Sequence, residues 1–124
     1  MRISICREYS FEAAHHLEYH NGKCHNLHGH SYRVEVEVEG ELCREGNDTG
    51  MVMDFAGLDY FVNSLVINKL DHTVINESLP EIYPTAENIA LWVFSELSQS
   101  FGLIVRLKRV RVYETARSYA EVVG

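Results

Sequence analysis

Two segments of the chain alternate apolar and polar residues with a period of two. The pattern covers residues 2–12 and, more cleanly, residues 31–39. The apolar positions are Ile3, Ile5, Tyr9 and Phe11 in the first segment and Tyr32, Val34, Val36 and Val38 in the second. Successive side chains of a strand point to opposite faces of a sheet, so this period is typical of half-buried strands. We therefore predict one strand in each segment.

Two later segments repeat apolar residues every three or four positions, as helices do. The first follows Asp54, whose carboxylate is placed to cap the free N–H groups of a first helical turn, and is expected to run for about 15 residues. The second begins at Thr85, carries Glu87 near the positive end of the helix dipole and is expected to end at Gly102. The sequence therefore predicts two amphipathic helices.

The C-terminal part returns to period two over residues 103–115, but the two halves of this segment are out of phase. One extra residue near Lys108 must be absorbed, for which a β-bulge suffices. A short last strand is expected over residues 119–123. The resulting order, ββααββ, predicts an α+β fold in which a four-stranded antiparallel sheet carries two helices on one face. We expect a single domain over residues 1–124, with exposed sheet edges that an oligomer would cover.

Composition and charge narrow the classes of function. The 124 residues carry a net charge of −7, and the only local basic cluster, over residues 106–111, alternates with apolar residues like the solvated face of a strand. We therefore expect no nucleic-acid partner. No segment has the apolar length of a membrane-spanning helix or the pattern of a signal peptide, which predicts a cytoplasmic protein without a membrane partner. The three cysteines do not suggest a disulfide framework.

Histidines are concentrated in residues 15–30, which hold six of the seven in the chain. His28 and His30 are two positions apart, so on a strand they project to the same face and can reach one metal ion. His15 lies at the end of the preceding strand, where antiparallel pairing would bring it alongside. Three neutral imidazoles suit Zn²⁺ and leave a fourth position open for water or substrate. The competing interpretation is a set of unrelated surface or core histidines.

Four further residues have side chains suited to chemistry. Cys24 precedes His28 by four positions and is predicted to lie in a loop near the metal, either as a proton-moving thiolate or as a fourth ligand that would close the site. Asp71 and His72 are adjacent, as in a carboxylate and imidazole that act as a general base. Glu114 has the parity of Val110 and Val112 near the end of its strand, so it needs a partner if that face is buried.

Taken together, these residues resemble the 6-pyruvoyl-tetrahydropterin synthase family over nearly the whole chain. Six blocks carry the resemblance: residues 11–15 (FEAAH), 24–30 (CHNLHGH), 50–55 (GMVMDF), 70–72 (LDH), 84–88 (PTAEN) and 114–115 (ET). Within the family, the three residues between Cys24 and His28 are similar to the interval in the bacterial 6-carboxy-tetrahydropterin synthases of queuosine biosynthesis.

The resemblance implies a zinc-dependent carbon–carbon lyase that converts 7,8-dihydroneopterin triphosphate to 6-carboxy-5,6,7,8-tetrahydropterin, acetaldehyde and triphosphate. It implies that His15, His28 and His30 hold the zinc and that Cys24, Asp71 and His72 move protons. Glu114 would accept two N–H bonds from the aminopyrimidine end of the pterin, and Thr85 would assist in binding it. The implied architecture is the tunnelling fold, assembled as a homohexamer, a dimer of trimers, with active sites between subunits.

Two alternatives to this function remain at this point. One is a 6-pyruvoyl-tetrahydropterin synthase or another pterin lyase, which would release a different product. The other is a module that binds zinc or pterin without catalysis. The presence of Cys24, Asp71 and His72 beside the proposed metal ligands favours an enzyme.

Overall fold

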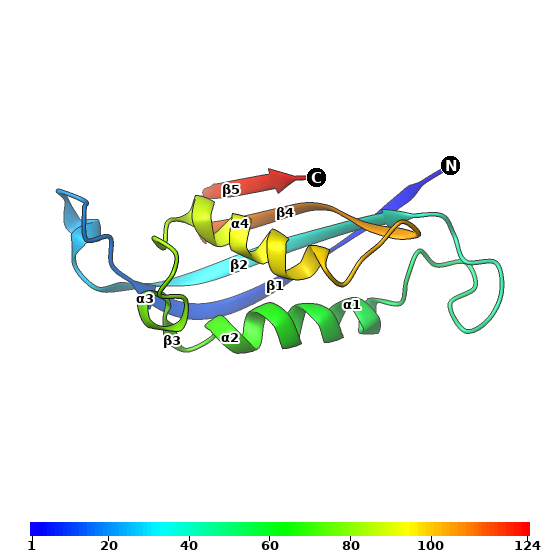
Figure 1. Cartoon of the computed structure of the whole chain (residues 1–124), viewed down its shortest axis with the longest axis horizontal. Helices are drawn as coiled ribbons and strands as arrows, with labels where there is room; N and C mark the ends of the chain where they lie inside the picture. The colour runs from blue at the N-terminus through cyan, green and yellow to red at the C-terminus, as the bar shows by residue number, and fades with distance from the viewer.

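The computed structural model describes residues 1–124 as one sheet covered by helices (Figure 1). Five strands are arranged in the order β3-β1-β2-β4-β5. Their bounds are β1 Ile3–His15, β2 His28–Gly40, β3 Thr73–Val74, β4 Val105–Thr115 and β5 Ser118–Val123. The principal helices are α1 Phe55–Val62, which continues through the π-helix η2 Asn63–Ile67 into α2 Asn68–Leu70, and α4 Ala86–Ser98. Two short helices complete the chain, η1 Lys23–His25 and α3 Ile75–Ser78.

The predicted α+β class is confirmed, but the prediction of a four-stranded antiparallel sheet is wrong. The sheet is mixed, because β3 adds a fifth strand that pairs in parallel with β1 through Ala13↔Thr73 and Ala14↔Val74. A strand of two residues is too short to produce an alternating pattern, so β3 has no periodic signal in the sequence. The other four strands are antiparallel neighbours, as expected.

The core lies between one face of the sheet and the helices, which contribute to a single cluster of buried apolar residues. Leu58, Val62, Val66 and Leu70 of the first helical segment are all fully buried. A spacing of four residues drifts by about 40° per step around an α-helix with 3.6 residues per turn. The wider turn of η2 offsets part of this drift, which keeps the apolar stripe directed at the sheet. None of the helices is both long and apolar enough to cross a bilayer.

The cap predicted at Asp54 is present, and Thr85, the predicted start of the second helix, is also a cap. The Asp54 carboxylate accepts a hydrogen bond from the N–H of Ala56, and the Thr85 side chain accepts one from the N–H of Asn88. The second helix ends at Ser98, before the glycine at 102 that was expected to end it. The predicted bulge is confirmed, because the pairing of β2 with β4 passes from Glu37↔Arg109 to Val38↔Leu107 and leaves out one residue of β4.

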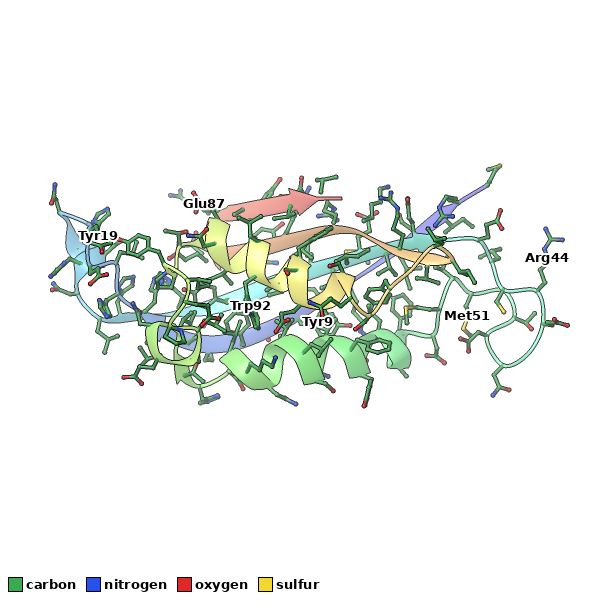
Figure 2. All side chains as sticks on the ribbon, viewed as in Figure 1. Tyr9, Tyr19, Arg44, Met51, Glu87 and Trp92 are labelled. Atoms are coloured by element: carbon green, nitrogen blue, oxygen red, sulfur yellow. The ribbon has the colours of Figure 1, made fainter.

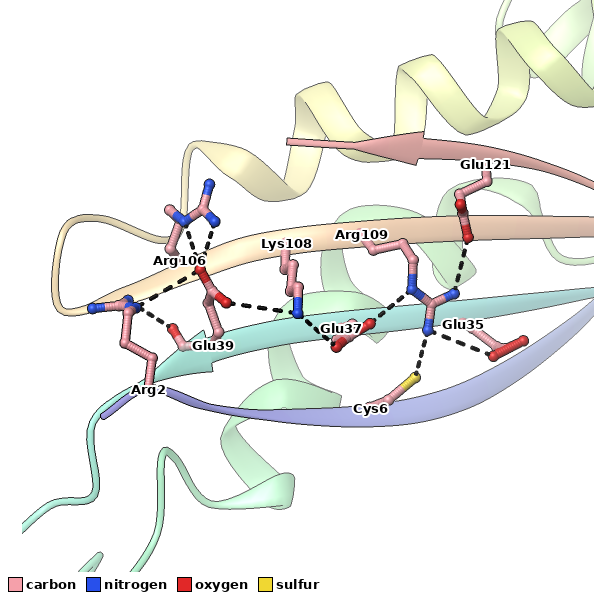
Figure 3. Close-up of polar contacts among 9 residues, drawn as sticks. All are labelled: Arg2, Cys6, Glu35, Glu37, Glu39, Arg106, Lys108, Arg109 and Glu121. Carbon is pink, nitrogen blue, oxygen red and sulfur yellow. Dashed lines mark hydrogen bonds and ion pairs between the residues drawn. The ribbon is translucent and has the colours of Figure 1, made fainter.

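The face of the sheet opposite the helices carries a ladder of ion pairs between β2, β4 and β5 (Figure 3). Arg109 pairs with Glu37 at 2.7 Å and with Glu121 at 3.3 Å, and Lys108 lies 3.7 Å from Glu37. Arg106 pairs with Glu39 at the end of the ladder. The basic residues of β4 therefore lie on a charged strand face, as predicted, with carboxylates beside them.

Candidate metal centre and active site

The pairing of β1 with β2 assembles the three predicted metal ligands at one end of the sheet. His15 lies directly opposite His28 in the antiparallel register, and His30 lies on the same face two residues along β2. The three rings are in mutual edge contact, with centroid separations of 4.6 Å for His15 and His28, 5.1 Å for His15 and His30, and 4.9 Å for His28 and His30. The structure thus places His15 beside His28 and His30, the two residues that the strand periodicity suggested.

Backbone carbonyls fix the orientation of two of these rings. The Nδ1 atom of His15 lies 2.7 Å from the carbonyl oxygen of Pro84, and Nδ1 of His28 lies 2.7 Å from that of Asn26. Carbonyl oxygens only accept hydrogen bonds, so each neutral ring carries its proton on Nδ1 and a lone pair on Nε2. The two Nε2 atoms are 3.1 Å apart. Lone pairs at this distance repel each other unless a cation binds both nitrogens.

A carboxylate completes the cluster. Oε1 of Glu114 lies 3.1 Å from Nε2 of His15 and 3.2 Å from Nε2 of His30. The ligand atoms of His15, His28, His30 and Glu114 are all within 4.8 Å of one another. Nε2 of His30 is buried and has no hydrogen-bond partner. Three imidazole nitrogens and one carboxylate oxygen form a donor set that suits a divalent metal such as zinc, so the residues present fit a metal site.

The electrostatics of the cluster favour its ligating forms. When Nε2 of His15 carries a proton, its hydrogen bond lowers the pKa of the Glu114 carboxyl; burial opposes this shift and the neighbouring His30 reinforces it, so Glu114 is an anion at neutral pH. Burial lowers the pKa of His30; Glu114 opposes this shift, and the neighbouring His15 and His28 reinforce it. Metal ligands must be deprotonated, so a neutral His30 and a charged Glu114 are in the required states.

Glu114 also lines a pocket of about 520 Å³ between α4 and β5. Its other walls include Ala90, Tyr119 and Glu87, and Figure 2 places Glu87 at the N-terminal end of α4. Thr85, the cap of α4, directly follows Pro84, whose carbonyl binds His15. Glu87 was not predicted as a site residue, because its position in the first turn of a helix has an ordinary explanation in the helix dipole.

The pair Asp71 and His72 lies at the edge of the sheet beside β1. Oδ1 of Asp71 is 3.0 Å from Nδ1 of His72 and accepts a hydrogen bond of 2.9 Å from the N–H of Glu12. That N–H lowers the pKa of the Asp71 carboxyl, and the adjacent His72 lowers it further, while burial raises it. His72 has a φ of 61°, and its side chain is 78% exposed. The His72 imidazole therefore points toward solvent. The Asp71 carboxylate beside it is held in place by the backbone N–H of Glu12.

Cys24 lies apart from this pair within the chain. It occupies η1, in the loop between β1 and β2, where its carbonyl accepts a hydrogen bond of 2.8 Å from the N–H of Leu17. The pocket that contains His72 is lined by Glu12, His30 and Ser31 among others, but Cys24 is not part of its wall. The structure brings together His15, His28, His30 and Glu114; His72 shares a pocket with His30, whereas Cys24 lies outside that pocket in the loop between β1 and β2.

Comparison with known proteins identifies the family. The profile described as 6-pyruvoyl tetrahydropterin synthase matches residues 4–124. The chain belongs to this family. This member is 47% identical over 117 residues to a 6-carboxy-5,6,7,8-tetrahydropterin synthase of Synechocystis sp., an alignment that covers 94% of this chain and 89% of that protein. It is 34% identical over 129 aligned residues to the human 6-pyruvoyl tetrahydrobiopterin synthase, covering 92% and 86% of the two chains.

The fold of this family member is also that of its solved relatives. The structure of the Caenorhabditis elegans 6-pyruvoyl tetrahydropterin synthase superposes with a TM-score of 0.84 at 28% identity, and the superposition covers 100% of this chain and 96% of that one. The expected membership in the 6-pyruvoyl-tetrahydropterin synthase family is therefore confirmed at the level of sequence and of the α+β fold.

Proposed function

We propose that this protein is a 6-carboxy-5,6,7,8-tetrahydropterin synthase that acts in queuosine biosynthesis. Its substrates would be 7,8-dihydroneopterin triphosphate and one water molecule, and its products 6-carboxy-tetrahydropterin, acetaldehyde and triphosphate. The observation that carries the proposal is the convergence of three imidazoles and one carboxylate beside a pocket of about 520 Å³. The similarity to the Synechocystis enzyme and the interval between Cys24 and His28 support this product over others of the family.

We propose zinc as the metal, held by His15, His28 and His30. Zinc would polarise the side-chain hydroxyls of the substrate and so acidify the neighbouring C–H bonds. The protein's part is to keep the Nε2 lone pairs directed at one point, through the Pro84 and Asn26 carbonyls. Glu114, at 3.1 Å from His15, occupies the side of the cluster that meets the pocket.

The pterin is proposed to bind between α4 and β5, with Thr85 and Glu114 as contacts. The sequence predicts that Glu114 accepts two N–H bonds from the aminopyrimidine, but the pocket also contains Glu87 and Glu121, of which Glu121 is paired with Arg111. One oxygen of Glu114 already faces two histidines, whereas Glu87 takes part in no ion pair. Two parallel N–H bonds require two free oxygens. We therefore assign the aminopyrimidine to Glu87 and place Glu114 against the part of the substrate next to the metal.

Cys24, Asp71 and His72 are proposed to move protons during triphosphate elimination, tautomerisation and carbon–carbon cleavage. Their separation within the chain supports an assembly in which one copy supplies Cys24 and another supplies the pair. β5 has no strand partner on its outer edge, and neither does most of β1, because β3 pairs with β1 only at Ala13 and Ala14. We propose a homohexamer, a dimer of trimers, in which these edges pair with other copies.

Complementation tests the composite site. Inactive Cys24→Ala and His72→Ala chains, unfolded together and refolded as mixed oligomers, should regain part of the wild-type rate, because some sites combine an intact Cys24 with an intact His72. No recovery in mixed oligomers that light scattering shows to be hexameric would place both residues in one chain's site.

Product analysis tests the activity itself. The purified protein loaded with zinc should release acetaldehyde and triphosphate from 7,8-dihydroneopterin triphosphate in equal amounts. A pyruvoyl product without acetaldehyde would instead favour the chemistry of the human relative. Cys24→Ala should abolish turnover while zinc stays near one per chain; loss of zinc in this variant would make the cysteine a ligand.

A further inference from the structure

The strand that carries His15 has weak support at its outer edge. β3 pairs with β1 only at Ala13 and Ala14, and at Ile75 the chain turns into α3. His15 is the ligand whose ring is completely buried, and it lies at the last residue of β1. Without further contacts, the strand beyond Ala14 would have a backbone partner on the β2 side alone.

A side chain extends this pairing. Oδ1 of Asn76 accepts a hydrogen bond of 2.9 Å from the N–H of His16, and Nδ2 of Asn76 donates one of 3.0 Å to the carbonyl of His16. The amide thus engages both backbone groups of the residue that follows His15, as a neighbouring strand would. Asn76 is half-buried, and the adjacent Ile75 is fully buried, which anchors the segment in the core.

The segment that contains Asn76 also binds β1 further toward its N-terminus, at Glu12. The carboxylate of Asp71 accepts the N–H of Glu12 at 2.9 Å, and the N–H of His72 donates to the Glu12 carbonyl at 2.6 Å. Residues 71–76 therefore follow β1 from Glu12 to His16 through side-chain contacts at both ends and strand pairing in the middle. The proton-moving pair and the buried metal ligand are held to one strand by one short segment.

We propose that Asn76 is a positioning residue of the metal centre, which holds the backbone at His16 so that the His15 ring meets His28 and His30. The inference rests on the proposed role of His15 as a ligand. His15 is held from both sides: its ring is bound by the Pro84 carbonyl at 2.7 Å, and its backbone is followed directly by the two bonds from Asn76. Residues that orient metal ligands in this way commonly change metal affinity or activity by about 10- to 100-fold when replaced.

Zinc alone is the probe for the test. Its affinity for the full chain is measured by competition with a chromophoric chelator, and the ligand geometry by the visible spectrum of the cobalt-loaded protein. Asn76→Ala should weaken zinc about 10- to 100-fold, alter the cobalt spectrum and lower kcat. Asn76→Asp keeps the acceptor for the His16 N–H but places a carboxylate oxygen against the His16 carbonyl, so it should weaken zinc at least as much as Asn76→Ala.

A matched control separates positioning from general stability. The Tyr9 hydroxyl donates a hydrogen bond of 2.7 Å from the same strand to Asp59, away from the metal cluster. Tyr9→Phe should lower the melting temperature and leave zinc affinity and the cobalt spectrum unchanged. If both Asn76 variants bind zinc within twofold of wild type, with an unchanged cobalt spectrum and a lower melting temperature only, the positioning role is refuted. Failure of the wild-type chain to bind one zinc would refute the proposed function instead.

Discussion

Replacing Glu87 with Gln most directly tests the proposal that Glu87 binds the aminopyrimidine end of the pterin. Glu87 lines the pocket between α4 and β5 and makes no ion pair, so its two oxygens are free for a ligand. Gln has nearly the same size, but it presents one oxygen and one NH₂ group where the carboxylate presents two acceptors. The aminopyrimidine edge of a pterin offers two N–H groups, so one of them would meet a donor in the variant.

The size of the effect follows from these contacts. A hydrogen bond to a charged group contributes about 1.5–3 kcal/mol, and the variant loses one such bond and weakens the other. A total of about 2–4 kcal/mol corresponds to a decrease in kcat/KM of about 30- to 1,000-fold. Glu87 also lies in the first turn of α4, where loss of its charge costs about 0.3–1 kcal/mol of stability through the helix dipole. This smaller cost cannot account for the kinetic effect.

The assay compares Glu87→Gln with Glu114→Gln. The first variant should retain zinc at wild-type affinity and lose kcat/KM, mainly through a higher KM. The second should weaken zinc about 10- to 100-fold, because Glu114 lies against two of the ligands. The assignment would be refuted if Glu87→Gln had wild-type kcat/KM, or if Glu114→Gln kept full zinc affinity while KM alone rose. The latter result would return the aminopyrimidine to Glu114.

Three further predictions concern stability. Thr85→Ala should lower the free energy of unfolding by about 0.5–2 kcal/mol in urea titration, since it removes the cap of α4, and an unchanged midpoint would contradict this role. Leu58→Ala should cost about 2–5 kcal/mol in the same titration, because the side chain is fully buried; a loss below about 1 kcal/mol would mean that the core closes over the gap. Burial raises the pKa of Glu37, but hydrogen bonds from Ser4 and Arg109 more than offset it, and the pKa lies below its ordinary value. The stability from this charge is complete above the pKa of the unfolded state, near 4.3, and is lost as pH falls through the lower folded-state pKa. Melting temperatures measured from about pH 6 down to pH 3 should therefore fall less steeply in Glu37→Gln than in wild type, and equal slopes would refute the contribution.

The sequence predicts those strands and helices whose hydrophobic patterns extend over many residues. The alternation of β2, the cap at Asp54, the start of the second helix at Thr85 and the extra residue near Lys108 all follow from local rules, and the structure confirms each one. β3 was missed because two residues cannot show a period, and its pairing depends on where α2 ends beside β1. The π-helix was missed as well, since a spacing of four residues is also compatible with a regular helix over a few turns.

Only part of the candidate site could be predicted from the sequence. The parity of His28 and His30 places both on one face from sequence alone, and the observed register supplies His15 opposite His28. The contact of Glu114 with His15 and His30 depends on the pairing of β2 with β4, which the sequence does not specify residue by residue. The Pro84 carbonyl that orients His15 carries no sequence signal, because every residue has a carbonyl.

The metal centre and the core are specified by one pattern. Along β2, the buried positions Val38, Val36, Val34 and Tyr32 lead without a change of parity to His30 and His28. A slip of one residue in the pairing would move the valines and the histidines together to the charged face. The large cost of exposing that apolar row therefore also excludes registers that would separate the ligands. For this reason three histidines can be held at one end of an open sheet, and the site needs only local contacts such as those of Pro84 and Asn26 to orient the rings.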